Sequence, residues 1–284
     1  TGKRKVLVTV FQRGAMDGLM AVAPLNDPRL KKMRPRLAMF AGRRQGANAL
    51  IDLDGRFGMH PDLAPLERFY REGRLAVVHG VGSPNPTRSH DVAQDCLETG
   101  TFGMKKTTSG WLNRLCGVLD HRASKFRAVS MTPALPLCLT GEEPAWTIAQ
   151  LRDSGTTLTP ELHLYQPARD VEYPRSSLGD SLKQIAALIK SGVGLEIAFA
   201  ETTGWDTHVQ QGTGNGTFAH RARDLSGSIA AFWKDVELHH DRVVLMTMTE
   251  FGRTVHENGS GGTDHGRASC FFVLGNLVDG GQVH

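Results

Sequence analysis

The feature that most constrains this chain is a regular alternation of short, β-rich apolar runs with helical patterns. The apolar runs that read as buried strands are residues 5–11, 75–80, 195–199, 243–248 and 270–274. Two of these runs follow segments whose leucine, isoleucine and phenylalanine residues recur at helical spacing, around 178–189 and 225–232. This alternation predicts an α/β fold, a three-layer sandwich with a mainly parallel central sheet and helices on both faces.

Length and composition are consistent with one α/β domain covering residues 1–284. The chain has 284 residues, of which 40% are hydrophobic, and this is enough apolar material for one large core. Residues 126–175 have no clear period and are rich in Pro, Thr and Leu, so we expect an irregular insertion or small cap there. The four cysteines form no CxxC pair, which favours buried apolar roles over a zinc knuckle or a disulfide framework.

Charge and hydropathy exclude two classes of partner. The formal net charge is +4, but Lys and Arg are scattered and not interleaved with aromatic residues, so a nucleic-acid platform is not predicted. A mildly basic surface favours small anionic substrates instead. No apolar run reaches the roughly 18 residues that a membrane span requires.

Carboxylates and imidazoles recur where the predicted strands end. They are Asp17 after the first run, residues 87–91 after the second, Asp206 and His208 after the third, Glu250 after the fourth, and Asp264 and His265 before the fifth. Ligands of open α/β sheets bind outside the carboxyl ends of the strands. Carboxylate oxygen and imidazole nitrogen together suit zinc, manganese or iron. A metal site is therefore predicted at this edge of the sheet.

Ser89 follows a Pro-rich loop and precedes a helical pattern, which predicts that it is a helix N-cap. It has two interpretations, a structural cap or a nucleophile whose hydroxyl is activated by a metal. Thr87 is the rival nucleophile, and Arg88 could hold an anionic group by a two-pronged hydrogen bond. A metal-free Ser-His hydrolase is disfavoured because no Gly-x-Ser-x-Gly turn surrounds the serine. Four histidines are left outside the predicted site: His60, His90, His239 and His240.

Several sequence blocks, in this order, resemble the DUF1501 family of bacterial proteins of unknown function. The blocks are Phe11 to Leu19, Arg88 to His90, Gly204 to His208, Glu250 to Thr254 and Glu257 to Gly266. That family in turn resembles the alkaline phosphatase and sulfatase superfamily. The resemblance implies an alkaline-phosphatase-like sandwich and hydrolysis or transfer of phosphate or sulfate esters.

The resemblance also implies a site that uses one or two divalent ions, with zinc or manganese first and calcium or magnesium as further candidates. One ion would belong to Asp17, Ser89 and Glu250, and the other to Asp206, His208 and His265, with Asp264 beside them. Ser89 would attack the ester, while Arg88 or Arg253 would hold its non-bridging oxygens. Family members often carry an export signal, which implies a periplasmic or exported protein, the alternative being a cytoplasmic one.

The chain departs from the superfamily pattern at three positions. Asp206 and His208 are two residues apart where the superfamily has four, Glu250 replaces an aspartate, and Phe251 stands where a partner histidine is expected. A one-metal site is therefore as well supported as a two-metal site. The departures also leave a second class open, a non-catalytic module that retains the fold and binds a metal, an anion or a partner protein. The family pattern further implies more chain around 164–176 and after residue 284.

Overall fold

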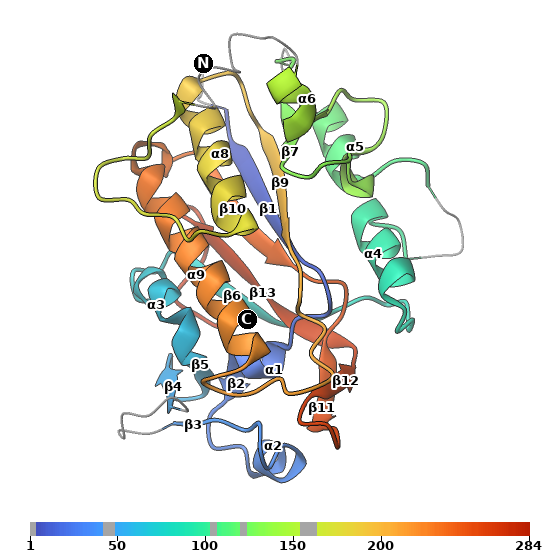
Figure 1. Cartoon of the computed structure of the whole chain (residues 1–284), viewed down its shortest axis with the longest axis vertical. Helices are drawn as coiled ribbons and strands as arrows, with labels where there is room; N and C mark the ends of the chain where they lie inside the picture. Colours follow the sequence, from blue (N-terminus) through green and yellow to red (C-terminus); the bar gives the residue numbers. More distant parts are fainter. Residues whose placement is uncertain (1–3, 42–48, 103–106, 120–123, 154–163) are drawn as a thin grey trace.

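A seven-stranded sheet forms the centre of the protein in the computed structural model (Figure 1), which describes residues 4–41, 49–102, 107–119, 124–153 and 164–284. The strand order is β6-β13-β10-β1-β9-β7-β8. The bounds are β1 Val6–Gln12, β6 Leu75–Gly82, β7 Ala128–Ser130, β8 Trp146–Thr147, β9 Ile197–Thr202, β10 Val243–Met248 and β13 Ala268–Gly275. All five predicted strands lie in this sheet, and the predicted fold class is confirmed.

Helices cover both faces of the sheet (Figure 1). On one side lie α3 (Ala64–Arg71), α8 (Ser177–Ser191) and α9 (Thr217–Asp235), and on the other lie α4 (His90–Thr99) and α5 (Trp111–Val118). The short helix α6 (Ile148–Asp153) directly follows β8. The long helices α8 and α9 match the two predicted helical patterns. Within the described residues, no helix combines the length and the apolar character needed to cross a bilayer.

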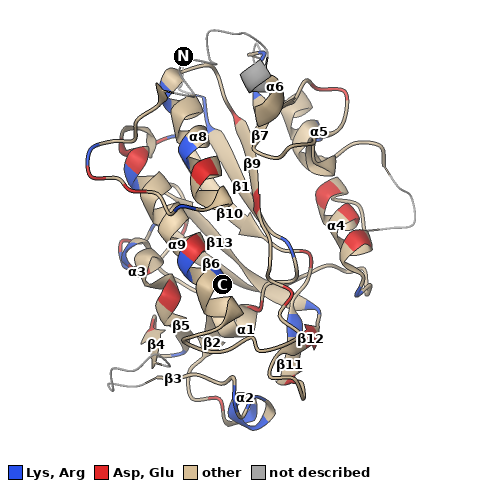
Figure 2. Ribbon diagram, in the orientation of Figure 1, with Lys and Arg blue, Asp and Glu red and all other residues tan. Residues whose placement is uncertain are grey.

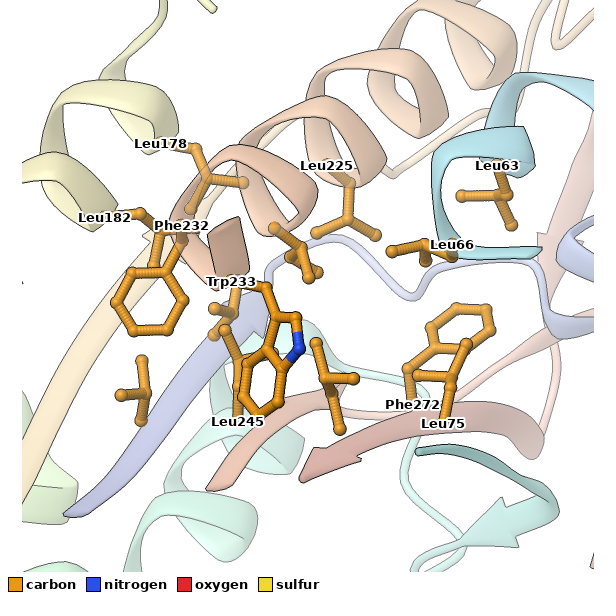
Figure 3. Packing of buried hydrophobic residues seen from close by; sticks show 14 of the residues in the cluster. Leu63, Leu66, Leu75, Leu178, Leu182, Leu225, Phe232, Trp233, Leu245 and Phe272 are labelled. Carbon is orange, nitrogen blue, oxygen red and sulfur yellow. The ribbon is translucent and has the colours of Figure 1, made fainter. Parts of the chain in front are cut away.

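The side chains of β1 contribute to two apolar clusters. Val6, Val8 and Val10 join the larger cluster, whereas Phe11 points into the smaller one beside Leu112 of α5. Figure 3 shows the larger cluster, in which leucines and aromatic rings of α8 and α9 meet the sheet. Burying both faces in this way explains why the strands read as continuous apolar runs in the sequence.

Smaller elements surround this sandwich. A four-stranded sheet has the order β2-β5-β4-β3, and β11 pairs with β12 in a hairpin. The bounds are β2 Val22–Pro24, β3 Phe40–Ala41, β4 Ala49–Asp52, β5 Phe57–Met59, β11 Arg253–Glu257, β12 Thr263–His265, α1 Gly18–Ala21 and α2 Pro28–Met33, with 3₁₀ turns at Pro61–Leu63, Leu137–Leu139 and Glu237–His239. The sequence pattern did not predict the small sheet. Lys and Arg are spread over many elements and form no continuous stripe in the described part of the chain (Figure 2).

Residues 126–175 contribute to the main sheet, since β7 pairs with β9 and β8 extends the edge. The stretch 154–163 lies outside the described residues. The insertion or cap expected there thus includes two strands of the central layer.

One strand of the sheet runs against the others. β13 is antiparallel to both β10 and β6, whereas β1, β7, β8, β9 and β10 pair in parallel. The first residue of β13 therefore lies beside the last residue of β6, Ala268 opposite Gly82. This reversal brings the segment that precedes β13 to the same edge as the segments that follow the parallel strands.

Candidate metal centre

Four side chains converge at this edge of the sheet. His90 is the first residue of α4, Asp206 and His208 follow β9, and His265 ends β12. The Nε2 atom of His265 lies 2.9 Å from Nε2 of both His90 and His208. The Asp206 carboxylate is 3.4 Å from His90 Nε2, 3.1 Å from His208 Nε2 and 3.3 Å from His265 Nε2. The Nε2 atom of His265 thus lies between those of His90 and His208, and the Asp206 carboxylate lies beside all three rings.

The other nitrogen of each imidazole is held from behind by an oxygen atom. The Nδ1 pairs are His90 with Glu250 Oε1 at 2.7 Å, His208 with Asp264 Oδ1 at 2.8 Å, and His265 with the Arg88 carbonyl at 2.7 Å. Carbonyl and ionised carboxylate oxygens only accept, so each Nδ1 carries the proton and donates it. The three Nε2 atoms then present lone pairs to one another.

Lone pairs at such distances cannot hydrogen-bond with each other, and a cation placed between them would bind them. A tetrahedral zinc ion bound at 2.0–2.1 Å separates its nitrogen ligands by about 3.3 Å, close to the spacing found here. A histidine ligand whose second nitrogen donates to a carboxylate or carbonyl is the usual outer-shell pattern of protein metal sites. His90, Asp206 and His265 offer ligand atoms that all lie within 4.8 Å of one another. The donor set therefore fits a divalent metal ion.

Glu250 is fixed behind His90. Its carboxylate is buried, and Oε1 accepts from the Gly14 amide at 2.9 Å and from Gln94 Nε2 at 2.9 Å. Burial acts to raise the pKa of Glu250, but hydrogen bonds from His90 and Gln94 outweigh it and lower the pKa below its ordinary value. The same His90 hydrogen bond raises the pKa of that histidine. Glu250 is predicted as a direct ligand, and in the structure its carboxylate lies behind His90 and bonds its Nδ1.

Arg253 holds Asp206. The guanidinium is buried, and its Nη1 lies 2.5 Å from Asp206 Oδ1 while Nε donates to Thr263 Oγ1 at 3.2 Å. Partial burial acts to raise the pKa of Asp206, yet the Arg253 hydrogen bond and charge lower it overall. Arg253 was predicted to bind the substrate, whereas the structure uses it to hold a carboxylate of the cluster.

Asp17 is closed off from the cluster. Only 1% of it is exposed, and Arg34 grips both of its oxygens, with Nη1 at 2.7 Å and Nη2 at 3.1 Å. Gln211 Nε2 donates to Oδ2 at 2.6 Å. The structure thus gives this aspartate, predicted as a metal ligand, a neutralising arginine.

Ser89 occupies the N-cap position of α4, as predicted, with extended backbone angles and no side-chain cap hydrogen bond within the described residues. Its backbone amide instead donates to Thr87 Oγ1 at 3.2 Å. Ser89 is exposed and flanked by two residues of the cluster's surroundings, Arg88 through its carbonyl and His90 through its ring. The serine hydroxyl is therefore beside the cluster along the chain and not engaged as a cap.

His90 is the residue that the sequence prediction missed. The prediction left it outside the site, but the structure places its ring between Glu250 and His265. Phe251 stacks on this ring with centroids 4.9 Å apart. The available signal was its position, because His90 opens the helix that follows a parallel strand. His60 and His240, also left out, lie elsewhere: His60 is buried and bonded to the Thr213 carbonyl, and His240 stacks on Trp233.

The fold is that of an alkaline-phosphatase-like α/β protein. The C-terminal periplasmic domain of EcEptC from Escherichia coli is similar with a TM-score of 0.51 and 10% identity, over 98% of this chain and 74% of that one. A protein in the alkaline phosphatase superfamily from Vibrio parahaemolyticus has a TM-score of 0.50 and 9% identity, over 100% of this chain and 62% of that one. At such identities the likeness concerns the fold. This chain spans less than two thirds of the Vibrio protein.

The family match is more local. The sequence signature described as protein of unknown function (DUF1501) matches residues 181–284, which confirms the resemblance over that stretch. The matched part includes Asp206, His208, Glu250 and His265, whereas His90 and Ser89 lie before it. No curated protein matches the chain in sequence.

Proposed function

We propose that the protein is a metal-dependent hydrolase or transferase that acts on phosphate or sulfate esters through Ser89. The observation that carries this proposal is that His265 Nε2 lies 2.9 Å from Nε2 of both His90 and His208, with the Asp206 carboxylate beside these rings. The likeness to a protein of the alkaline phosphatase superfamily supports the substrate class.

In this proposal His90, Asp206, His208 and His265 hold the ion, with Glu250, Asp264 and the Arg88 carbonyl orienting the rings. A bound divalent ion would lower the pKa of a nearby hydroxyl and stabilise negative charge on the ester. The Ser89 Oγ atom attacks the phosphorus or sulfur atom, and its proton passes to solvent water. The bond to the leaving alcohol breaks, and the alcohol oxygen takes up a proton from solvent water.

The second half of the reaction releases the group from Ser89. Water, for a hydrolase, or an acceptor hydroxyl, for a transferase, attacks the same atom and restores the serine. The exposed Arg88 side chain could hold the non-bridging oxygens through both steps.

We infer one ion of zinc or manganese, because imidazole-rich sites with one carboxylate favour these metals. The residues that a second ion would need are already used. Arg34 neutralises Asp17, and Glu250 bonds His90.

The experiment is metal analysis of protein purified without chelator, followed by assays on p-nitrophenyl phosphate and p-nitrophenyl sulfate with zinc or manganese supplied. We expect one ion per chain, and an activity that Ser89→Ala abolishes while the metal content stays unchanged. Thr87→Ala tests the rival nucleophile and should retain part of the activity, since it removes only the hydroxyl that accepts from the Ser89 amide. Absence of hydrolysis or transfer with a fully loaded site would refute the catalytic proposal.

The second candidate is a non-catalytic module that binds a metal or an anion. Phe251 favours it, since an apolar ring packs on His90 where a further ligand is expected, and Arg253 is already paired with Asp206. A loaded site without ester cleavage, together with full cellular function of Ser89→Ala, would favour this candidate.

We also propose a periplasmic or exported location. The similar part of the Escherichia coli protein is a periplasmic domain, and the resemblance to DUF1501 proteins points the same way. Fractionation of cells that express the full-length protein tests the proposal, and recovery in the cytoplasm alone would contradict it.

A further inference from the structure

The turn after β1 contains an arginine that is fixed on three sides. Arg13 donates from Nε to Glu201 at 2.6 Å, from Nη1 to Gln94 Oε1 at 2.8 Å, and pairs through Nη2 with Glu98 at 2.9 Å. The planar guanidinium matches several acceptors at once, so its orientation is determined by all three partners. Arg13 lies outside the cluster and has no role in the proposed reaction.

Gln94 connects this arginine to the cluster. Its Oε1 accepts from Arg13, and its Nε2 donates to Glu250 Oε1 at 2.9 Å. An arginine can only donate and an ionised carboxylate can only accept, so the amide of Gln94 has one possible orientation. A flipped amide would place donor against donor and acceptor against acceptor.

The next residue of the same turn acts on the same carboxylate. The Gly14 amide donates to Glu250 Oε1 at 2.9 Å. Gly14 has φ +115°, and a Cβ atom there would lie 2.6 Å from the Asp206 amide nitrogen. Glycine is therefore required for the turn to approach both Glu250 and the loop that carries Asp206.

We propose that Gln94, clamped by Arg13, is a positioning residue that fixes Glu250 so that His90 keeps its proton on Nδ1 and offers Nε2 to the metal. The inference rests on the proposed metal site. Without the Gln94 hydrogen bond, the Gly14 amide and Thr249 would still hold Glu250 but would fix the carboxylate less firmly against His90, and the bond that sets the tautomer of the imidazole would weaken.

The test compares Gln94→Leu with Gln184→Leu, a matched control on α8 whose side chain donates to the Asp180 carbonyl. Binding of Zn²⁺ and Co²⁺ is measured by calorimetry and by the Co²⁺ absorption spectrum. We expect about 10-fold weaker binding for Gln94→Leu, at the lower end of the effects of outer-shell residues, and a changed Co²⁺ spectrum. The control should bind as the wild type does.

A second readout uses the metal-free protein. Nitrogen-15 NMR of the histidine rings should show His90 protonated on Nδ1 in the wild type and a larger share of the Nε2-protonated tautomer in Gln94→Leu. This readout tests the positioning role of Gln94 even if the wild type binds no metal. Failure of the wild type to bind metal would contradict the proposed function and leave the effect of Gln94 on the His90 tautomer measurable.

Gln94→Met keeps the length of the side chain and serves as a second variant where Gln94→Leu does not fold. We expect the same loss of affinity with an unchanged thermal unfolding temperature. Wild-type metal affinity and an unchanged His90 tautomer in a folded Gln94 variant would overturn the proposal.

Discussion

Two arginine–carboxylate pairs at the same edge of the sheet have different surroundings. Asp17 follows β1 and pairs with Arg34 at 2.7 Å, while Asp206 follows β9 and pairs with Arg253 at 2.5 Å. The Asp17 side chain is 1% exposed and both of its oxygens are engaged, whereas the Asp206 side chain is 41% exposed and faces three imidazoles. The first pair is closed and can only stabilise the fold. The second leaves the Asp206 carboxylate facing three imidazoles, an arrangement that can bind a ligand.

The two pairs are joined by a short hydrogen-bond chain. Gln211 donates to Asp17 and accepts from Thr263 Oγ1 at 2.7 Å, and Thr263 in turn accepts from Arg253 Nε. The Asp17–Arg34 pair is thus connected, through Gln211 and Thr263, to the arginine that holds Asp206. The comparison can be tested by disrupting each pair separately.

The largest effect is expected from Arg34→Met, which leaves the Asp17 charge buried without its partner. Breaking a buried pair in this way costs about 3–5 kcal/mol of unfolding free energy. Urea denaturation at neutral pH measures this loss. The double variant Asp17→Asn/Arg34→Met should recover part of the stability, and a single variant as stable as the wild type would show that the pair is not closed.

His265→Ala removes the ring that lies between the other two. We expect metal affinity to fall by more than the roughly 100-fold that outer-shell changes can cause, because a direct ligand is lost. Stability of the metal-free protein should change by less than about 1 kcal/mol, since the ring is partly exposed. Calorimetry and thermal unfolding without metal separate the two effects, and unchanged affinity would contradict the assignment.

Glu250→Gln tests the carboxylate behind His90. The neutral amide is a weaker acceptor for the Nδ1 proton, so we expect metal affinity to fall about 10- to 100-fold. Equilibrium dialysis against zinc measures the change. Equal affinities for the variant and the wild type would mean that His90 is not a ligand.

Asp264→Asn is the matched change behind His208, and we expect about a 10-fold loss, the lower limit for an outer-shell residue. The effect should be smaller than for Glu250→Gln because the Asp264 side chain is 57% exposed and solvent can replace the hydrogen bond. The same dialysis applies. A larger loss than for Glu250→Gln would reverse the predicted ranking.

The smallest effect concerns pH. The Glu250 hydrogen bond raises the pKa of His90, so protons compete for Nε2 at pH values above the ordinary histidine pKa of about 6.5. Metal binding should therefore weaken as the pH falls through this raised pKa. In Glu250→Gln the decline of zinc affinity should move to lower pH. Zinc titrations at several pH values measure this shift, and a shift to higher pH would contradict the prediction.

Much of the site could be predicted because strand ends are visible in the sequence. Asp206, His208 and His265 each border an apolar run, and parallel strands bring such borders to one edge. His265 also lies at this edge because β13 runs backwards, a direction that apolar runs do not reveal. His90 was missed because its position at a predicted helix start does not distinguish a solvated histidine from one that faces the site.

The sequence by itself determined the elements and the edge at which polar residues collect, because hydrophobic periodicity and strand ends are local properties. Tertiary structure alone decided the role of each carboxylate. Asp17 and Asp206 have similar places after strands, but Arg34 reaches one through the packing of α2, while the loops around the other bring three imidazoles together. The partner of each carboxylate depends on contacts between segments that are distant in the sequence, and no local sequence pattern encodes these contacts.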